Sequence, residues 1–452
     1  MNPPRHIVVI IADSLRHDAV YRNNTTLLPY FEQKAIQYTQ ARSSGCWTLP
    51  ATASLFTGLM PHQHGATSQT RYVRTDVPTL AERLKAIGYH TYQVTANVAT
   101  TDVFGLHRGF DEIRKIWKIV PAHFNRLQQF LLLISKPRLR RMIFSKDLIA
   151  QKLSEDIEMQ KTWLQLTHED VFNEARKIIA QHDAKNEKCF IFLNLMESHF
   201  PYHVGATLEM SADGMVNRLR ESSALFNTIN QTFLTTGKLG IKPEMLKVLR
   251  ERQRKSWEII APAINRFTEE VHRDQENMVV FGSDHGDNFG DQGWLYHFSN
   301  VTDGGNKVPL MILPPDDNLQ PQSLAMPVNT KDLYATILDS CGIGAGASLL
   351  KYPEESVSVL QSYWYNNKGK TLPQYKYNQI CFVEGEHRYV YRSTNWLWAP
   401  ISKDGGREPE FEPLVPQANP IYDAVKNPER RKKLNAIFND FKTFAEKIGT
   451  GN

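Results

Sequence analysis

The chain has 452 residues, a formal net charge of +5, 41% hydrophobic residues and 22% charged residues. This balance is ordinary for a globular protein, excludes a disordered or fibrous chain, and gives no reason to expect a nucleic-acid partner. The length exceeds that of one hydrophobic core, so we expect a large domain and a smaller second one.

The amino terminus enters an apolar run directly, without the basic start, long apolar core and cleavage site of a signal peptide. No stretch approaches the roughly 20 consecutive apolar residues of a membrane-spanning helix. The four cysteines lie far apart and form no CxxC pair, which is typical of reduced thiols. We therefore expect a cytoplasmic protein that is not integral to a membrane.

Three apolar runs predict buried parallel strands, because strands covered on both faces are continuously apolar. They are 6–12 (HIVVIIA), 189–196 (CFIFLNLM) and 278–282 (MVVFG). Polar residues follow each run, namely Asp13 with Ser14, Glu197 to His199, and Ser283 to Asp287. Open α/β sheets place their sites at the carboxyl ends of strands, so we expect a site there.

Helical stretches at 77–86, 169–180 and 331–339 alternate with these strands, and a further strand is expected at 308–313. The alternation predicts an α/β fold, a doubly wound and mostly parallel sheet with helices on both faces. We assign it to a large domain over 1–345, with a mostly helical insertion at about 116–263.

The last part of the chain differs in composition, being rich in Tyr, Trp, Gly and Pro. Short strand-like runs at 379–384 and 388–392 predict a small carboxyl-terminal α+β domain over 346–452 with an antiparallel sheet. Apolar residues recur at helical spacing over 428–448, so this domain is expected to end in an amphipathic helix.

A basic segment at 114–146 contains no acidic residue and includes the apolar run FLLLI. We favour an insertion packed over the site. The alternative is peripheral contact with an anionic membrane surface, which basic amphipathic stretches can make.

The segment 45–65, GCWTLPATASLFTGLMPHQHG, places Thr48 just before an apolar helical run that ends at Gly58. A hydroxyl at the start of a helix lies near free N–H groups and the positive end of the dipole, a setting that suits an anionic ester. Threonine is a weak nucleophile and needs a metal to lower its pKa. With Asp13, Asp284 and His285, Thr48 would form a site suited to Mn²⁺, Mg²⁺, Ca²⁺ or Zn²⁺.

Nearby histidines are tempting as further ligands, but we expect His62 and His64, in the loop after this helix, to be satisfied by backbone groups. For Asp287 the ordinary role is to cap the turn that follows it.

These residues resemble the sulfatase branch of the alkaline phosphatase superfamily, which includes phosphonate monoester hydrolases and phosphodiesterases. The resemblance covers nearly the whole chain. The matching pieces are DSLR at Asp13, TLPATASLFTGLMPHQHG, PTLAERLKAIGYHTYQVTAN, HRGFDE, NLMESHFPY, SDHGD, KVPLMILPP, KDLYATILDSCGI and PIYDAVKNPE.

The resemblance implies a role for each candidate residue. Asp13, Asp284 and His285 would be metal ligands, and Thr48 would be both ligand and nucleophile. His199 and His297 would bind the non-bridging oxygens of the ester or protonate the leaving group. Weaker candidates for substrate binding are Glu197 and Arg16, and Arg16 could instead be structural.

The sequence departs from the family pattern at the nucleophile. Sulfatases carry a cysteine, oxidised to formylglycine, in a CxPxR signature, whereas this chain has Thr48-Leu49-Pro50-Ala51-Thr52. Cys46 is no substitute, because no proline follows it by two residues. Ser14 stands where many sulfatases have an acidic ligand, and His285 where many have asparagine, so these changes favour phosphorus over sulfur.

The sequence thus predicts a metal-dependent hydrolase or transferase that acts on a phosphodiester or a phosphonate or phosphate monoester. The substrate would be a small-molecule or lipid-like anionic ester. One alternative is a sulfatase that works without formylglycine. Another is a catalytically idle binding module that keeps the fold.

Overall fold

The computed structural model describes most of the first 351 residues and short pieces beyond them. The described residues are 3–21, 26–67, 72–120, 166–202, 229, 232, 236, 238–297, 300–315, 319–344, 346, 348–351, 358–363, 378–384, 387–393, 411–413 and 436.

The centre of the fold is an eight-stranded sheet in the order β10-β2-β9-β6-β1-β5-β3-β4. Its strands are β1 (His6–Ala12), β2 (Ile36–Arg42), β3 (Tyr89–Thr95), β4 (Glu112–Lys115), β5 (Lys188–Leu195), β6 (Met278–Gly282), β9 (Leu310–Leu313) and β10 (Gln322–Asn329). Neighbouring strands are parallel except that β9 runs antiparallel to both β6 and β2. The predicted mostly parallel sheet is confirmed.

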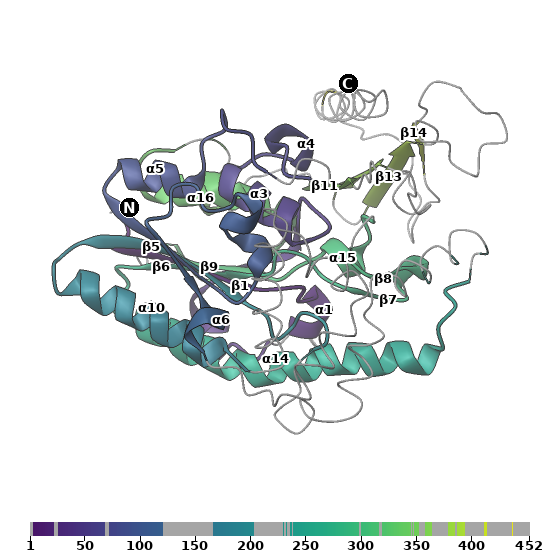
Figure 1. Ribbon diagram of the computed structural model, residues 1–452, viewed down its shortest axis with the longest axis horizontal. Helices are drawn as coiled ribbons and strands as arrows, with labels where there is room; N and C mark the ends of the chain where they lie inside the picture. The colour runs from purple at the N-terminus through teal and green to yellow at the C-terminus, as the bar shows by residue number, and fades with distance from the viewer. Residues whose placement is uncertain are drawn as a thin grey trace, which may run out of the picture.

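Helices cover both faces of the sheet, because successive side chains of a buried strand point to opposite faces. On β1, Ile7, Val9 and Ile11 join one core, while Val8 and Ile10 join the other. The first core contains α3 (Thr48–Thr57), α5 (Leu80–Ala86) and α16 (Leu333–Ser340), and the second contains α2 (Pro29–Lys34), α10 (His168–Asp183) and α14 (Pro243–Val271). Figure 1 shows these two layers of helices on either side of the strands.

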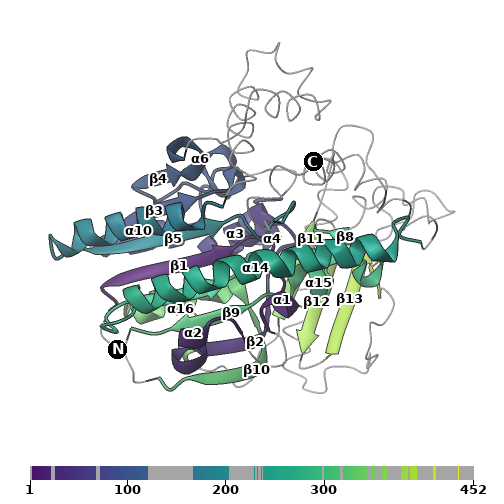
Figure 2. The same ribbon diagram turned by 90° about the horizontal axis from the view of Figure 1, so that it is seen from below.

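Short elements lie between the main strands and helices. The β7-β8 hairpin packs on the first half of α14 and on the loop at 200–202, through Phe289, Leu295 and Leu249 among others (Figure 2). The short elements are α1 (His17–Val20), α4 (Pro61–His64), α6 (Ile116–Ile119), α15 (Asp303–Asn306), β7 (Asn288–Phe289), β8 (Leu295–Tyr296), and 3-10 turns at Val98–Thr100, Asp102–Phe104, Asp291–Gly293, Thr330–Asp332 and Leu349–Lys351.

A second sheet lies toward the carboxyl terminus and is antiparallel, as predicted. It runs β11-β12-β13-β14, with β11 (Ser358–Tyr363), β12 (Asn378–Glu384), β13 (His387–Ser393) and β14 (Phe411–Pro413). Cys381 and Val383 of β12 pack against Val301 of the large domain. The predicted helix at 428–448, apart from residue 436, and most of the basic segment at 114–146 lie outside the described residues.

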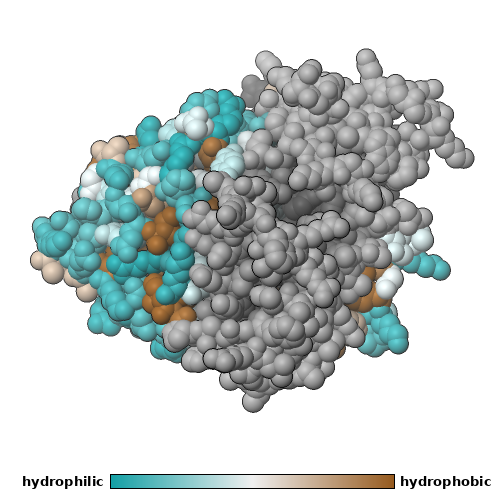
Figure 3. Space-filling view, in the orientation of Figure 1, coloured by the Kyte–Doolittle hydropathy of each residue, from teal (hydrophilic) through white to brown (hydrophobic). Residues whose placement is uncertain are grey.

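The domain limits at 345 and 346 stay a prediction. Within the range 116–263, the described residues form α6, α10, β5 and much of α14, which continues to Val271. None of the described helices is long and apolar enough to span a membrane. In the view of Figure 3 the described surface is mostly hydrophilic, and its hydrophobic residues form small separate patches.

Candidate active site

The four residues expected to bind metal meet at the carboxyl ends of two neighbouring strands. Asp13 follows β1, Asp284 and His285 follow β6, and Thr48 is the first residue of α3. Because β1 and β6 are paired in parallel, residues about 270 positions apart in the chain come together. All four side chains are buried, with relative exposures of 5% or less.

The Nε2 atom of His285 is the point on which the other three groups converge. It lies 3.3 Å from Thr48 Oγ1, 3.4 Å from Asp284 Oδ2 and 3.8 Å from Asp13 Oδ1. Two carboxylates, a hydroxyl and an imidazole thus face a common point from three segments of the chain.

The hydrogen bonds of this cluster suit a cation. His285 Nδ1 lies 3.0 Å from the carbonyl oxygen of Gly286, which can only accept, so Nδ1 carries a proton. In the neutral ring Nε2 then points a lone pair at the carboxylates. Asp284 Oδ2 is buried and has no hydrogen-bond donor among the described residues. Such a hard, mixed oxygen and nitrogen donor set fits a divalent cation.

The site holds two carboxylates, Asp13 and Asp284, close together and buried away from water. Burial and the neighbouring Asp13 carboxylate raise the pKa of Asp284. Burial lowers the pKa of His285, but the attraction of Asp284 and Asp13 outweighs it, so this pKa is raised overall. A cation held among these groups would relieve the repulsion between the two carboxylates.

Neighbouring side chains fix the orientation of both carboxylates. Asp13 Oδ1 accepts from Ser14 Oγ at 3.1 Å, and Oδ2 accepts from Asn97 Nδ2 at 2.7 Å and Asn194 Nδ2 at 3.3 Å. Ser14 holds a left-handed backbone conformation (φ 61) that lets its N–H donate to Asp284 Oδ1 at 3.1 Å. Sequence reasoning missed both asparagines, although Asn194 stands out as a polar residue inside an apolar strand.

His199 and His297 lie beside the proposed ligands. The ring of His297 is 4.5 Å from that of His285 and 5.5 Å from that of His199, measured between centroids. His297 Nδ1 contacts Asp287 Oδ1 at 2.6 Å, and Tyr202 Oη donates to Asp287 Oδ2 at 2.9 Å. Asp287 was interpreted from the sequence mainly as a turn cap, but here it holds the ring of His297.

The pKa values of His297 and Asp287 are both lowered, but for different reasons. Burial lowers the pKa of His297 to about 4, even though the nearby Asp287 carboxylate opposes the shift. Burial would raise the pKa of Asp287, but the charge and hydrogen bond of His297 outweigh it and lower the pKa.

The two weaker candidates for substrate binding are engaged by the protein itself. Arg16 is buried and pairs with Asp18 at 2.7 Å and with Asp291 at 2.7 Å, which matches the structural alternative. Glu197 Oε1 accepts from two backbone N–H groups at the start of α10, at 2.7 and 2.8 Å, and so caps that helix. These contacts give both residues structural roles, and a role for either in substrate binding stays a prediction.

Among the loop histidines, His64 makes local hydrogen bonds. Its Nδ1 accepts from the backbone N–H of Ala66 at 3.0 Å, and its Nε2 lies 3.0 Å from Ser54 Oγ of α3. His64 is fully buried and supports the helix that begins with Thr48.

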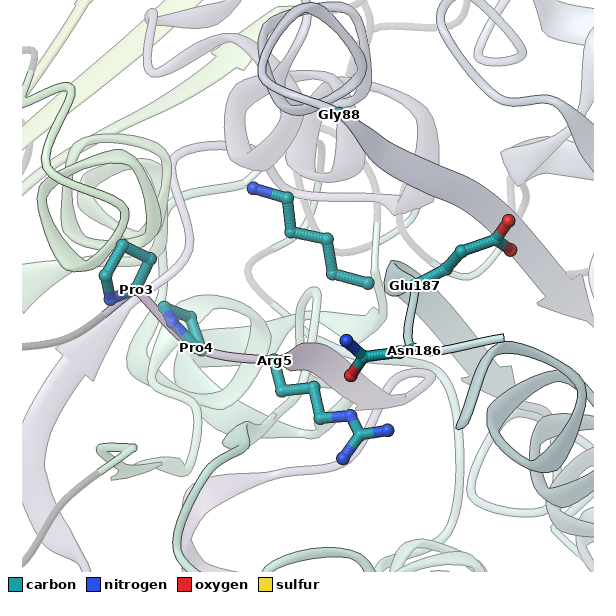
Figure 4. Close-up of a pocket in the computed structure, with 7 residues that line it drawn as sticks. Pro3, Pro4, Arg5, Gly88, Asn186 and Glu187 are labelled. Atoms are coloured by element: carbon teal, nitrogen blue, oxygen red, sulfur yellow. The ribbon is translucent and has the colours of Figure 1, made fainter. Parts of the chain in front are cut away.

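A surface pocket of about 450 Å³ lies elsewhere on the molecule (Figure 4). Its lining includes Pro4 and Arg5, just before β1, and Lys188 at the start of β5. These are the amino ends of the strands, opposite the ends where Asp13 and the other candidate ligands lie. We therefore do not connect this pocket with ester chemistry.

Comparisons with known proteins give the family of the chain. Residues 5–343 match the family model described as Sulfatase. No curated protein matches the chain.

Several solved structures share the fold. A phosphonate monoester hydrolase from Silicibacter pomeroyi superposes with a TM-score of 0.59 at 16% identity, over 96% of this chain and 94% of that one. The enzyme of the same name from Agrobacterium radiobacter gives 0.60 at 16% identity, over 98% and 96%. A 2-O GAG sulfatase, BT1596, gives 0.59 at 15% identity, over 98% and 93%. The chain belongs to the sulfatase family of ester hydrolases.

Proposed function

We propose that the protein is a metal-dependent hydrolase or transferase that acts on a phosphoester, with Thr48 as the nucleophile. The observation that carries this proposal is the position of Thr48 Oγ1, buried at the start of α3 and 3.3 Å from His285 Nε2. A small-molecule or lipid-like anionic ester fits the positive end of this helix.

Asp13, Thr48, Asp284 and His285 would hold the divalent cation that the family implies. When bound, it would lower the pKa of a hydroxyl and neutralise negative charge on the ester. Asn97 and Asn194 would keep the Asp13 carboxylate in one orientation, as outer hydrogen bonds do for metal ligands.

Thr48 Oγ1 would attack phosphorus in line with the leaving oxygen. The hydroxyl proton of Thr48 would pass to solvent, a bond would form between Oγ1 and phosphorus, and the bond to the leaving alcohol would break, which gives a phosphorylated or phosphonylated threonine. His199 and His297 are placed to bind the ester oxygens or to give a proton to the leaving oxygen. His297 would donate from Nε2 only in its protonated form, which the negative charge of a bound ester favours. In the second step water, in a hydrolase, would break the bond between Oγ1 and phosphorus and release phosphate, a phosphate monoester or a phosphonate, according to the substrate. In a transferase an alcohol would accept the same group, and Thr48 is freed in either case.

Threonine at position 48 supports phosphorus as the target element, because its side chain cannot form the hydrated aldehyde that lets sulfate leave by elimination. A sulfate ester is the second candidate, since the fold superposes equally well on a 2-O GAG sulfatase and on a phosphonate monoester hydrolase.

The test is a paired assay of p-nitrophenyl phosphodiester, phosphonate and sulfate hydrolysis, after metal analysis, with and without a chelator. Thr48→Ala is expected to lower phosphoester turnover by at least about 10³-fold. The matched control is Thr52→Ala, one turn further along α3, whose buried Oγ1 has no hydrogen-bond partner among the described residues.

Turnover that survives Thr48→Ala would refute the assignment of the nucleophile. Turnover of the sulfate alone would replace phosphorus by sulfur. Loss of activity in Thr52→Ala as well would show that the helix, and not the hydroxyl of Thr48, was disturbed.

A further inference from the structure

A second cluster of ligand-type side chains lies at the opposite end of the sheet from Thr48. It comprises His90, the second residue of β3, His182 near the end of α10, and Glu187 in the turn that precedes β5. One ligand atom from each residue lies within 4.8 Å of the other two. The cluster shares no residue with the candidate active site.

The distances within the cluster are close to those around a zinc ion. His182 Nδ1 lies 2.8 Å from Glu187 Oε2, and His90 Nε2 lies 3.6 Å from the same oxygen. With metal to ligand distances of about 2.0–2.2 Å, neighbouring ligands of a tetrahedral zinc are roughly 3.3 Å apart. The two distances to the Glu187 oxygen lie within about 0.5 Å of that value.

The fold holds His182 in the orientation that a metal ligand needs. Its ring is buried, and Nε2 lies 2.9 Å from Tyr92 Oη. This is the outer hydrogen bond that metal-binding histidines usually make through their second nitrogen, and it leaves Nδ1 to face Glu187. The Glu187 N–H donates to the carbonyl oxygen of His182 at 2.9 Å, so the turn itself brings these two residues together.

The other two ligands are open to solvent. The side chains of His90 and Glu187 are 47% and 36% exposed, so an ion can enter and water can complete its coordination. The ring of His90 now stacks on that of His182, with centroids 4.6 Å apart, and must turn for Nε2 to point at the common centre. Figure 4 shows the Glu187 carboxylate directed away from the pocket that Arg5 lines.

We propose that His90, His182 and Glu187 form a zinc-binding site that is separate from the ester site. Two imidazoles and one carboxylate with a water-accessible fourth position are a donor set that zinc takes in proteins. A bound ion would join β3, the end of α10 and the turn before β5, and would stabilise the fold by binding the native state alone.

The test uses full-length protein in which Asp284→Asn disables the ester site, so that the outcome does not depend on the proposed function. Zinc binding is measured by competition with a chromophoric chelator, and the thermal midpoint is recorded with and without zinc. This protein is expected to bind one zinc ion per chain and to melt at a higher temperature with zinc.

Adding either His90→Ala or Glu187→Gln should weaken zinc binding at least 10-fold and abolish the rise in the midpoint. Both residues lie at the surface, so neither change threatens folding. The matched control is His107→Ala, another exposed histidine, which should change neither quantity. The proposal is overturned if the Asp284→Asn protein binds no zinc, or if both added variants bind it as tightly as their parent.

Discussion

The side chain of His297 is held by Asp287 and Tyr202, which are not among the four proposed metal ligands. Its Nδ1 lies 2.6 Å from Asp287 Oδ1, whose partner oxygen accepts a hydrogen bond from Tyr202. Asp287 is fully buried, so its charge acts in a medium that screens it weakly. This chain of contacts aims the ring of His297 at the space beside His285.

Removing this support should slow the proposed reaction without removing the metal. We expect Asp287→Ala to lower kcat by roughly 10²-fold, the lower end of what a proton donor contributes, and Tyr202→Phe to have a smaller effect in the same direction. The measurement is kcat and KM for the best ester, together with the metal content of each variant. If Asp287→Ala loses the metal as well, Asp287 is a ligand and not a positioning residue.

For single residues, the candidate metal ligands could be predicted from the sequence, but the side chains that orient these ligands could not. Asp13 and Asp284 each follow an apolar strand, so a site at the strand ends could be predicted. Asn97 and Asn194 contact Asp13 because β5 lies beside β1 and β3 lies beside β5. That strand order is a property of the tertiary fold, which local patterns do not contain.

Among the elements, α3 depends on α4 for the position of its side chains. His64 of α4 contacts Ser54 of α3 and is fully buried, and burial lowers the pKa of His64 to about 3. The unfolded chain has an ordinary histidine pKa of about 6.5, so it takes up a proton before the folded protein does. Stability from this group is therefore complete above about pH 6.5 and is lost as the pH falls toward 3.

The pH dependence gives a test of this element pair. The free energy of unfolding should fall by up to about 1.4 kcal/mol per pH unit below pH 6.5 because of His64 alone. His64→Gln should show a smaller loss between pH 7.5 and pH 5.0, by about 2 kcal/mol, in urea unfolding. The exposed His107→Ala is the control, and an identical loss in wild type and His64→Gln would contradict the argument.

The central strands of the large sheet could be predicted from their continuous apolar sequences, whereas the strands toward its edges could not. The runs at 6–12, 189–196 and 278–282 correspond to β1, β5 and β6, which lie in the middle of the sheet. β2 and β10 lie toward one edge and contain both buried and partly or fully exposed residues, so their sequences are more polar. The antiparallel direction of β9 depends on its neighbours and has no local signal.

For the whole molecule, the candidate active site lowers the stability of the folded protein when no metal is bound. Asp13 and Asp284 are both buried, and their mutual repulsion helps raise the pKa of Asp284. These two acids lie where an apolar or neutral side chain would make the folded protein more stable. Metal binding would reverse this penalty, because the ion attracts both carboxylates and binds the native state alone.

The variant Asp284→Asn separates the repulsion between the two carboxylates from the stabilisation that a bound metal would give. The asparagine oxygen can keep the bonds from the N–H groups of Ser14 and His285, at 3.1 and 3.0 Å, while its NH₂ group faces the Nε2 lone pair of His285. Without metal this variant should therefore be more stable than wild type, by about 1 to 2 kcal/mol. With the cognate metal the order should invert, because a neutral asparagine is the weaker ligand and wild type gains more binding energy.

The measurement is the thermal midpoint of both proteins after chelation and after adding back Mn²⁺, Mg²⁺, Ca²⁺ or Zn²⁺ in turn, with the exposed Asp274→Asn as control. For Zn²⁺, both proteins also carry His90→Ala, so that the second cluster contributes nothing. The opposite outcome is a wild type whose thermal midpoint does not change with any metal, together with a lower midpoint for Asp284→Asn. That outcome would mean that Asp284 stabilises the fold as an ordinary hydrogen-bonded acid. In that case the buried carboxylates would no longer support a metal site, and the proposed role of Thr48 would lose the group that activates it.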